Sequence, residues 1–440
     1  MSFSTDQQTL EDLDIFGRHG TESIFTIFNR THTRGAAAIL EDWFRYPLDD
    51  DKAINHRSSI IRFFAAQRTS FPFTVEAVDQ VELYLSNTDE RTRLPPGDQT
   101  FRDKMSGLIA EDSTYKTIHK GVVALLEMLR HLQDFLSTIG PETPYQSGKQ
   151  QLLLLLSTES IHQILQETQP RKLPYPKIAA YDEVFRFRHH GIIRKLLSQI
   201  YLLDIYISVA GVARDRNLSF ALALPGSERV VYLQGLFHPQ VKNAVPNDLD
   251  LDPGTNVLFL TGANMAGKST FMKSFGISLF LAHMGMPVPA SKMTFSVRDG
   301  LYTTINLPDN LGMGASHFYA EVLRIRKIAM ELSAGKSLFV IFDELFRGTN
   351  VKDAYEATIA LTTAFATRQD STFVISTHII EAGDVIRKNC PSVRFVYLPT
   401  RMKGNTPVYT YTLEKGITAD RHGMIIIRNE GILEKLKKAK

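Results

Sequence analysis

The sequence has little that would suit an oxidising or membrane environment. Its 440 residues include one cysteine, Cys390, so no disulfide can form within the chain and no cysteine-based zinc site is possible, which favours a reducing cytoplasm. The longest apolar run near mid-chain, Leu152 to Leu156, is far too short to span a bilayer. The N-terminal stretch MSFSTDQQTLEDLD is polar and acidic, unlike a signal or transit peptide. We therefore predict a cytoplasmic protein without a membrane partner.

A large charge excess is also missing. The net charge is +3, with 22% charged and 43% apolar residues, which is ordinary for a globular protein. This balance does not by itself mark a nucleic-acid binder, so any basic surface has to be local. No internal repeat or low-complexity segment is present, and the length favours two or three domains.

Two modules follow one another along the chain. Residues 36–46, 119–138 and 150–168 carry apolar residues at intervals of three and four, which predicts helices. The pattern from Tyr181 to Val212 predicts one uninterrupted helix of roughly 45 Å. After Asn217, short apolar runs alternate with helical patterns, typical of a mostly parallel sheet covered by helices. We place an all-α module at 1–218 and an α/β module at 219–440.

The strands predicted in the second module have apolar centres. They lie at 229–234, 256–261, 337–342, 372–376 and 394–398. Residues 394–400 and 406–413 also resemble a hairpin that turns across Lys403, Gly404 and Asn405.

The strongest chemical signal is a glycine-rich loop between a predicted strand and a predicted helix. The loop consists of Gly262, Ala263, Asn264, Met265, Ala266, Gly267, Lys268 and Ser269, followed by Thr270. Its backbone N–H groups can surround phosphates, Lys268 can reach the β- and γ-phosphates, and the Ser269 hydroxyl can ligate Mg²⁺. The alternative is an incidental glycine-rich turn. The pattern predicts a P-loop that binds ATP and Mg²⁺.

Two carboxylates and a histidine follow later strands. Asp343 and Glu344 come directly after the run 338–342, and His378 follows the run 372–376. Beside a P-loop, Asp343 would support Mg²⁺, Glu344 would deprotonate the attacking water, and His378 could contact the γ-phosphate or that water. Alone, the acids could form a solvated loop and the histidine could be structural.

A second glycine-rich segment precedes a predicted helix near Tyr319. Gly312, Gly314 and Ser316 stand at its N-terminus, which makes it either an anion-binding element or a plain capped helix start.

Together these elements resemble the ATPase domain of the MutS family of DNA mismatch-repair proteins. TGANMAGKST is similar to the family's TGPNMGGKST, DELFRGTN to its DE-x-GRGTS, and NLGMGASHFYAEV to its signature-loop segment. STH stands where the family has its histidine motif, and Phe237-His238-Pro239 with Val245-Pro246-Asn247-Asp248 matches an upstream stretch. The resemblance extends over residues of about 20–430, including THTRGAAAILEDWFRYPLDDDKAINHRSSIIRFF.

The resemblance implies a multidomain fold: a core/lever module like MutS domain III, then an ABC-type P-loop ATPase domain like MutS domain V. It implies an ATP hydrolase with Glu344 as general base, His378 at the γ-phosphate, and Ser269 and Asp343 at Mg²⁺. Gly314 and Ser316 would complete the site of a second protomer in an ATP-dependent homodimer that binds double-stranded or branched DNA.

Several positions depart from the family pattern. Ala266 and Phe346 replace glycines, and Asn350 replaces a serine or threonine. The adenine-stacking aromatic expected before Val245 is Ala244, for which Tyr411 is a candidate substitute. The family's mismatch wedge is a Phe-x-Glu pair, and the one such pair here ends at Glu344. We therefore expect no direct reading of mismatches, no N-terminal mismatch-reading domain and little of the C-terminal dimerisation element.

Basic residues gather around the start of the predicted long helix. They are Arg171, Lys172, Arg186, Arg188, Arg194 and Lys195, with His189 and His190 between them. They form either a solvated helix face or a surface that contacts DNA phosphates. The first hypothesis is a DNA-associated clamp in repair or recombination. The alternatives are an ATP-switched clamp on ribosomal or other RNA, and an adaptor for protein partners.

Overall fold

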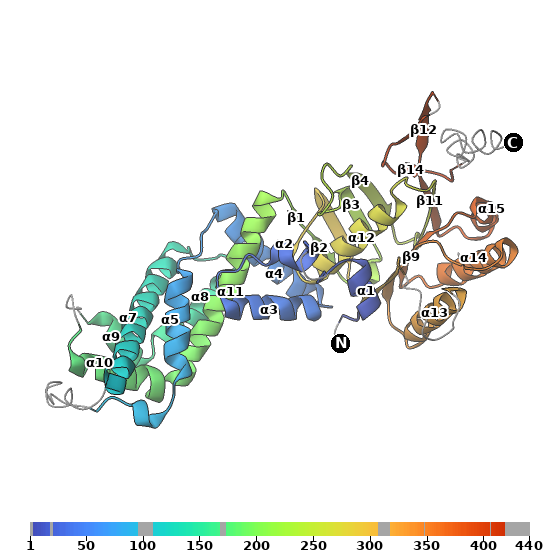
Figure 1. The fold of residues 1–440 in the computed structure, drawn as a ribbon. Coiled ribbons are helices and arrows are strands. Elements are labelled where there is room, and N and C mark those ends of the chain that lie inside the picture. The colour runs from blue at the N-terminus through green and yellow to red at the C-terminus, as the bar shows by residue number, and fades with distance from the viewer. Residues whose placement is uncertain are drawn as a thin grey trace, which may run out of the picture. The chain divides into compact units, whose positions relative to one another are not determined.

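The computed structural model describes residues 3–17, 21–95, 109–167, 173–306, 317–346, 348–404 and 406–418 (Figure 1). The chain divides into two compact units. The sheet unit comprises residues 1–28, 43–58 and 213–440, and the helical unit comprises residues 29–42 and 59–212. The unit that carries the sheet thus also takes in the N-terminal segment.

The helical unit is built from antiparallel and crossing helices. Its elements are α5 (Val75–Ser86), η1 (Glu90–Thr92), α7 (Ile109–Thr138), α8 (Gln146–Leu156), α9 (Glu159–Gln166), α10 (Tyr175–Asp182) and η2 (Glu183–Arg188). Three further helices, α3 (Arg34–Arg45), α4 (Asp51–Gln67) and α11 (His190–Asp215), run across the unit boundaries. α5 and α7 pack closely because Gly121 has no side chain: a Cβ there would lie 2.3 Å from Cβ of Tyr84.

The predicted helix 36–46 corresponds to α3, which ends one residue earlier at Arg45, and the predicted helix 119–138 lies within α7. Two other predicted helices are interrupted in the structure. The segment 150–168 is interrupted at Ser157 and Thr158, between α8 and α9. The single helix predicted from Tyr181 to Val212 is wrong, because α10 passes into the π-helical turn η2 and α11 starts only at His190. That wide turn carries Arg186, whose buried guanidinium fixes the local geometry.

Arg186 forms a buried ion pair inside the helical unit. Its Nε and Nη2 lie 2.5 and 2.6 Å from the two Asp182 carboxylate oxygens, and the Tyr84 hydroxyl donates to the same carboxylate at 2.7 Å. Arg186 therefore belongs neither to a solvated basic face nor to a phosphate-contacting one. Arg188, Arg194 and Lys195 are exposed, and residues 171 and 172 lie outside the described residues.

One described helix, α11, is long and apolar enough to cross a membrane by length and composition alone. Of its most apolar window, 67% is buried inside the structure. This burial is what a core helix of a globular protein shows.

The sheet unit contains a six-stranded sheet with the strand order β14-β11-β5-β10-β9-β8. Its strands are β5 (Val257–Gly262), β8 (Gly300–Thr304), β9 (Leu338–Phe342), β10 (Thr372–Ser376), β11 (Val393–Leu398) and β14 (Glu414–Lys415). All neighbours are parallel except β14, which runs antiparallel to β11. Every residue of β5, β8, β9 and β10 is buried, which agrees with the prediction of strands covered on both faces.

Helices and smaller sheets surround this sheet. The helices are α1 (Gln7–Asp12), α2 (Ile24–Phe28), α12 (Lys268–His283), α13 (His317–Ser333), α14 (Val351–Ala366), α15 (Ile380–Asn389) and the short η3 (Gly226–Glu228). A four-stranded sheet contains β2 (Leu222–Leu224), β7 (Lys292–Ser296), β3 (Val231–Leu236) and β4 (Asn247–Leu251). β1 (Ser219–Phe220) pairs with β6 (Pro287–Val288), and β12 (Thr400–Lys403) pairs with β13 (Thr406–Tyr409).

The predicted hairpin is correct at its turn and wrong at its start. β12 and β13 pair across Gly404, but residues 393–398 belong to the six-stranded sheet, where they pair in parallel with β5. The chain leaves the large sheet at Pro399, whose missing N–H cannot continue a ladder. The strands that were not predicted are β1, β2, β4, β6, β7, β8 and β14.

The buried pair in the helical unit gives a stability prediction. Asp182→Ala leaves the Arg186 guanidinium buried without a counter-charge, so the free energy of unfolding is expected to fall by about 3–5 kcal/mol. Urea denaturation followed by circular dichroism measures the change. The matched control is Glu183→Ala at the next residue, which removes an exposed pair with Arg93 and should cost far less. Equal losses in the two variants would contradict this account.

Candidate functional site

The glycine-rich loop follows β5 and leads into α12, as its sequence predicted. Gly262 and Gly267 have φ values of +153° and +100°, and Met265 has a φ of +67°. The backbone angle of Gly267 favours glycine, and a Cβ there would lie 3.1 Å from Cδ1 of Tyr411, a tight contact that the partly exposed ring would have to relieve. Ala266 is buried and is not among the residues with positive φ, which explains why alanine is accepted at this position.

Lys268, the first residue of α12, lies folded back over the loop. It is 5% exposed, and its Nζ donates to the carbonyl oxygens of Gly262 at 3.0 Å and Ala263 at 3.3 Å. Burial lowers the pKa of Lys268, and the nearby carboxylates of Glu344 and Asp343 oppose that shift. The ammonium is therefore already located at the loop, beside two acids.

Asp343 is the most constrained side chain of the site. Its Oδ2 accepts a hydrogen bond from the Ser269 hydroxyl and its Oδ1 accepts one from the Ser376 hydroxyl, each at 2.5 Å. Its backbone N–H donates to the carbonyl oxygen of Thr304 at 2.9 Å. The Asp343 carboxylate thus connects the start of α12 with the end of β10, and its backbone N–H connects the residue to the end of β8.

Glu344 and His378 form a pair next to this carboxylate. Glu344 Oε1 lies 2.5 Å from His378 Nε2, and the Glu344 backbone N–H donates to the Ser376 hydroxyl at 3.3 Å. Glu344 has a φ of +54°, an uncommon conformation for a residue with a side chain. The structure therefore brings Lys268, Ser269, Asp343, Glu344 and His378 to one edge of the sheet.

Ser376 is a site residue to which the sequence analysis assigned no role. It contacts both acids, and its signal in the sequence was a hydroxyl at the end of the strand that neighbours β9. A hydroxyl at the end of an adjacent parallel strand is well placed to reach a carboxylate at the same edge.

Tyr411 lies next to the glycine-rich loop. Its side chain is 45% exposed and its φ is +55°. Asn247 holds this segment in place, because its Nδ2 donates to the Tyr411 carbonyl oxygen at 2.9 Å and its Oδ1 accepts from the Leu413 N–H at 2.6 Å. An aromatic face is thereby available beside the loop.

The segment after the two acids is buried against α13. Phe346 has a φ of +63°, although it stands where the family pattern has glycine. It is 5% exposed, and its ring lies 5.8 Å from the ring of Phe318. Asn350 caps α14, with its Oδ1 accepting from the Asp353 N–H at 2.9 Å. Gly314 and Ser316 lie outside the described residues.

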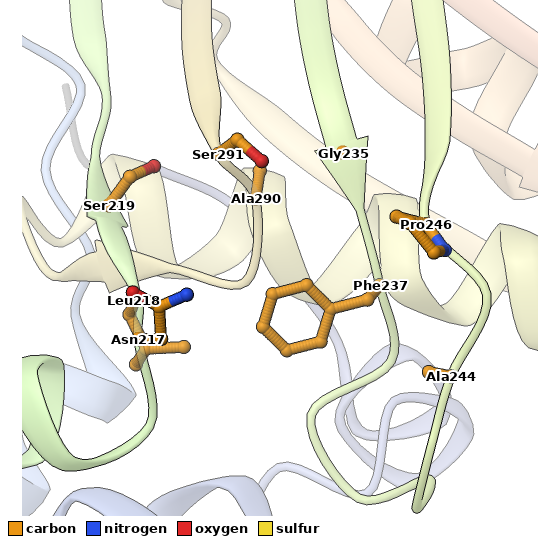
Figure 2. A pocket seen from close by; sticks show the side chains of 9 residues that line it. All are labelled: Asn217, Leu218, Ser219, Gly235, Phe237, Ala244, Pro246, Ala290 and Ser291. Atoms are coloured by element: carbon orange, nitrogen blue, oxygen red, sulfur yellow. The ribbon is translucent and has the colours of Figure 1, made fainter.

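A separate cavity of about 390 Å³ opens at the end of the four-stranded sheet. Figure 2 shows the Phe237 ring projecting from the end of β3 toward Asn217 and Leu218. Ala244 and Pro246 also line it, but residues 262–269 do not. The cavity is therefore distinct from the glycine-rich loop.

The polar groups beside the loop suit a hard cation. Carboxylate and hydroxyl oxygens, as in Asp343 and Ser269, are the ligands that Mg²⁺ prefers, usually together with water and phosphate oxygens. Among the described residues, no group of three or more His, Cys, Asp or Glu side chains could hold a metal ion by itself. A metal here would thus need ligands from a phosphate group or from water.

The fold and the site define an α/β protein with a glycine-rich loop at the carboxyl edge of the parallel strands of its sheet. Comparison with known proteins identifies its relatives. The family model of MutS domain V matches residues 258–439. The DNA mismatch repair protein MutS of Caldicellulosiruptor bescii is 29% identical over 255 residues, which is 56% of this chain and 29% of that protein.

A second relative gives the same result. The DNA mismatch repair protein MutS of Fusobacterium nucleatum is 27% identical over 250 residues, covering 56% of this chain and 27% of that protein. Residues 258–439 are therefore similar to domain V of MutS proteins, and the chain shares 27–29% identity with these two relatives. The matched region spans less than a third of the length of these curated relatives.

Proposed function

We propose that this chain is a Mg²⁺-dependent P-loop ATPase of the MutS type that acts on DNA. The observation that carries the proposal is the convergence of Lys268, Ser269 and Asp343 beside the glycine-rich loop. In this interpretation residues 219–440 form the ABC-type ATPase domain and residues 1–218 the core/lever module. The match to MutS domain V over residues 258–439 supports the first assignment.

The loop residues would bind the triphosphate. The backbone N–H groups of residues 263–270 surround the phosphates, and Lys268 exchanges its two carbonyl partners for the β- and γ-phosphate oxygens. Ser269 and Asp343 would hold Mg²⁺, and the ion would neutralise charge that develops on the phosphate oxygens. Tyr411 offers a face on which the adenine can stack.

Glu344 is the proposed general base. It accepts a proton from the water whose oxygen attacks the γ-phosphorus, and ADP is the leaving group. The 2.5 Å contact with His378 orients the Glu344 carboxylate, and in this proposal the imidazole would lie beside the γ-phosphate. The Ser376 hydroxyl donates to the Asp343 carboxylate and accepts from the Glu344 N–H, so it supports the positions of both acidic residues.

A homodimer that forms on ATP is the second part of the proposal. Gly314 and Ser316 of one protomer would complete the site of the other. Met265 at the loop and Val351 at the start of α14 are 76% and 79% exposed, and a partner surface would cover such apolar side chains. Binding ATP across this interface would convert the nucleotide state into opening and closing of a clamp.

DNA is the proposed partner in the cytoplasm, in repair or recombination and without direct reading of mismatches. The exposed Arg188, Arg194 and Lys195 of the helical unit are candidates for phosphate contacts. The relatives are DNA mismatch repair proteins, which supports DNA over RNA or a protein partner. Phosphate contacts would make binding steeply dependent on salt concentration.

Replacing the general base separates ATP binding from hydrolysis. Glu344→Gln is expected to bind ATP with wild-type affinity, because the carboxamide keeps the shape of the side chain. Its turnover should fall by about 100-fold or more, since a carboxamide cannot accept the proton. Steady-state phosphate release measures turnover, and size-exclusion chromatography with ATP should show the trapped dimer.

The control for this prediction is Lys268→Ala, which should lose ATP binding itself and form no trapped dimer. Normal turnover by Glu344→Gln would remove Glu344 from the role of base. Normal ATP binding by Lys268→Ala would remove the P-loop assignment.

Mixing two inactive variants tests whether the site is shared between protomers. Ser316→Ala and Lys268→Ala are each expected to be inactive when present alone. In a mixed dimer, one site combines an intact Lys268 with an intact Ser316, so part of the activity should return. Phosphate release at varied mixing ratios measures this recovery. No recovery at any ratio would show that each protomer works alone.

A further inference from the structure

The N-terminal strap, residues 3–13, covers the edge of the six-stranded sheet. β8 is the outermost strand on this side, and Ser4 forms a parallel bridge with Gly300. The Ser4 N–H donates to the Asp299 carbonyl oxygen at 2.7 Å, and the Leu301 N–H donates to the Ser4 carbonyl oxygen at 2.9 Å. The strap thus satisfies an edge that would otherwise have unpaired backbone groups.

Asp12 of the strap holds the chain that leaves β8. Its Oδ2 accepts from the Thr303 hydroxyl at 2.7 Å and the Ile305 N–H at 2.9 Å. Its Oδ1 accepts from the Asn306 N–H at 2.9 Å and from Gln8 Nε2 at 3.0 Å. Asp12 is 2% exposed, so both carboxylate oxygens are buried acceptors with donors on each side.

Asp6 connects the strap to α13 through Arg324. The guanidinium of Arg324 pairs with the Asp6 carboxylate, and Nη2 also donates to the Thr303 carbonyl oxygen at 2.8 Å. Lys327 of α13 lies 2.7 Å from the same carboxylate. Hydrogen bonds from these two basic side chains and from Thr9 lower the pKa of Asp6 against the opposing effect of burial.

The end of β8 contacts the backbone of Asp343, the residue that carries the proposed metal carboxylate. The Asp343 N–H donates to the Thr304 carbonyl oxygen at 2.9 Å. Thr304 lies between Thr303 and Ile305, the two residues whose groups donate to Asp12 Oδ2. One short path of hydrogen bonds therefore runs from Asp12 through residues 303–305 to Asp343.

The strap is also held against the helix that follows the P-loop. Leu13 is 1% exposed, and its Cδ2 would lie 2.8 Å from a Cβ at Gly276 of α12. The strap therefore contacts α12, β8 and α13 at once. If the strap only covered the edge of the sheet, it would not need a buried carboxylate that accepts hydrogen bonds from the residues at the end of β8.

We propose that the N-terminal strap is a positioning element of the metal site: Asp12 fixes the end of β8 and thereby the Asp343 backbone, from which the carboxylate projects. The effect on Mg²⁺ rests on the proposed function, whereas the coupling between Asp12 and Asp343 does not. Asp12 is a positioning residue, because it acts through residues 303–305.

The test uses Asp12→Asn in the full chain. Both Asp12 oxygens accept hydrogen bonds from donors. In asparagine one of these oxygens becomes an NH₂ group, which cannot accept and would face a donor. The Mg²⁺ concentration that half-saturates ATP hydrolysis should rise by about tenfold, as for other residues that support a metal ligand. Binding of a fluorescent ATP analogue in EDTA should not change. Glu11→Gln, an exposed acid-to-amide change next to Asp12, is the matched control and should behave as wild type.

Hydrogen–deuterium exchange provides a readout that needs no nucleotide. In Asp12→Asn, peptides that cover residues 301–306 and 338–344 should exchange faster than in Glu11→Gln, because both strand ends lose support. Asp6→Asn, at a less buried position, should raise the Mg²⁺ requirement and the exchange rates by a smaller amount. This variant replaces Asp12→Asn in the test if Asp12→Asn does not fold.

The two proposals fail in different ways. Wild-type exchange at residues 338–344 in folded Asp12→Asn would overturn the strap proposal even if the protein had no ATPase activity. An unchanged Mg²⁺ requirement would also overturn it. Wild-type protein that neither binds nor hydrolyses ATP would overturn the proposed function and leave the exchange result to decide on the strap.

Discussion

The position of the Asp343 carboxylate depends on two hydroxyls from different parts of the chain. Ser269 approaches from the start of α12 and Ser376 from the end of β10, each at 2.5 Å. Both donors sit at the carboxyl edge of a parallel sheet, where strand ends gather the groups that act on a ligand. The geometry holds only if β5, β9 and β10 keep their register, so the site depends directly on the packing of the sheet.

The carboxyl edge of the sheet contains groups and backbone conformations that lower the free energy of unfolding. Lys268 is nearly buried among two carbonyl oxygens and two acids, and Glu344 and Phe346 both occupy left-handed backbone conformations. Such conformations cost on the order of 1–3 kcal/mol each and persist where the surroundings enforce them. Here the surroundings are fully buried strands on both sides and the contact between Phe346 and Phe318.

Much of the architecture could be predicted because its signals are local. The apolar runs that became β5, β9, β10 and β11 are recognisable from sequence alone, and the glycine-rich loop carries its own backbone requirements at Gly262 and Gly267. The π-helical turn at Arg186 could not be predicted, because it accompanies buried hydrogen bonds among Arg186, Asp182 of α10 and Tyr84 of α5. The roles of Ser376 and Asp12 depend on contacts between residues that are far apart in the chain, and no local pattern encodes them.

The central claim is that the loop, Lys268 and Asp343 form a binding site for a nucleoside triphosphate and Mg²⁺. The most direct test is calorimetric titration of the purified full chain with a non-hydrolysable ATP analogue, with Mg²⁺ and in EDTA. The account predicts saturable binding that Mg²⁺ strengthens, and weakening of that effect in Asp343→Asn. Absence of Mg²⁺-dependent affinity for any nucleoside triphosphate would contradict it.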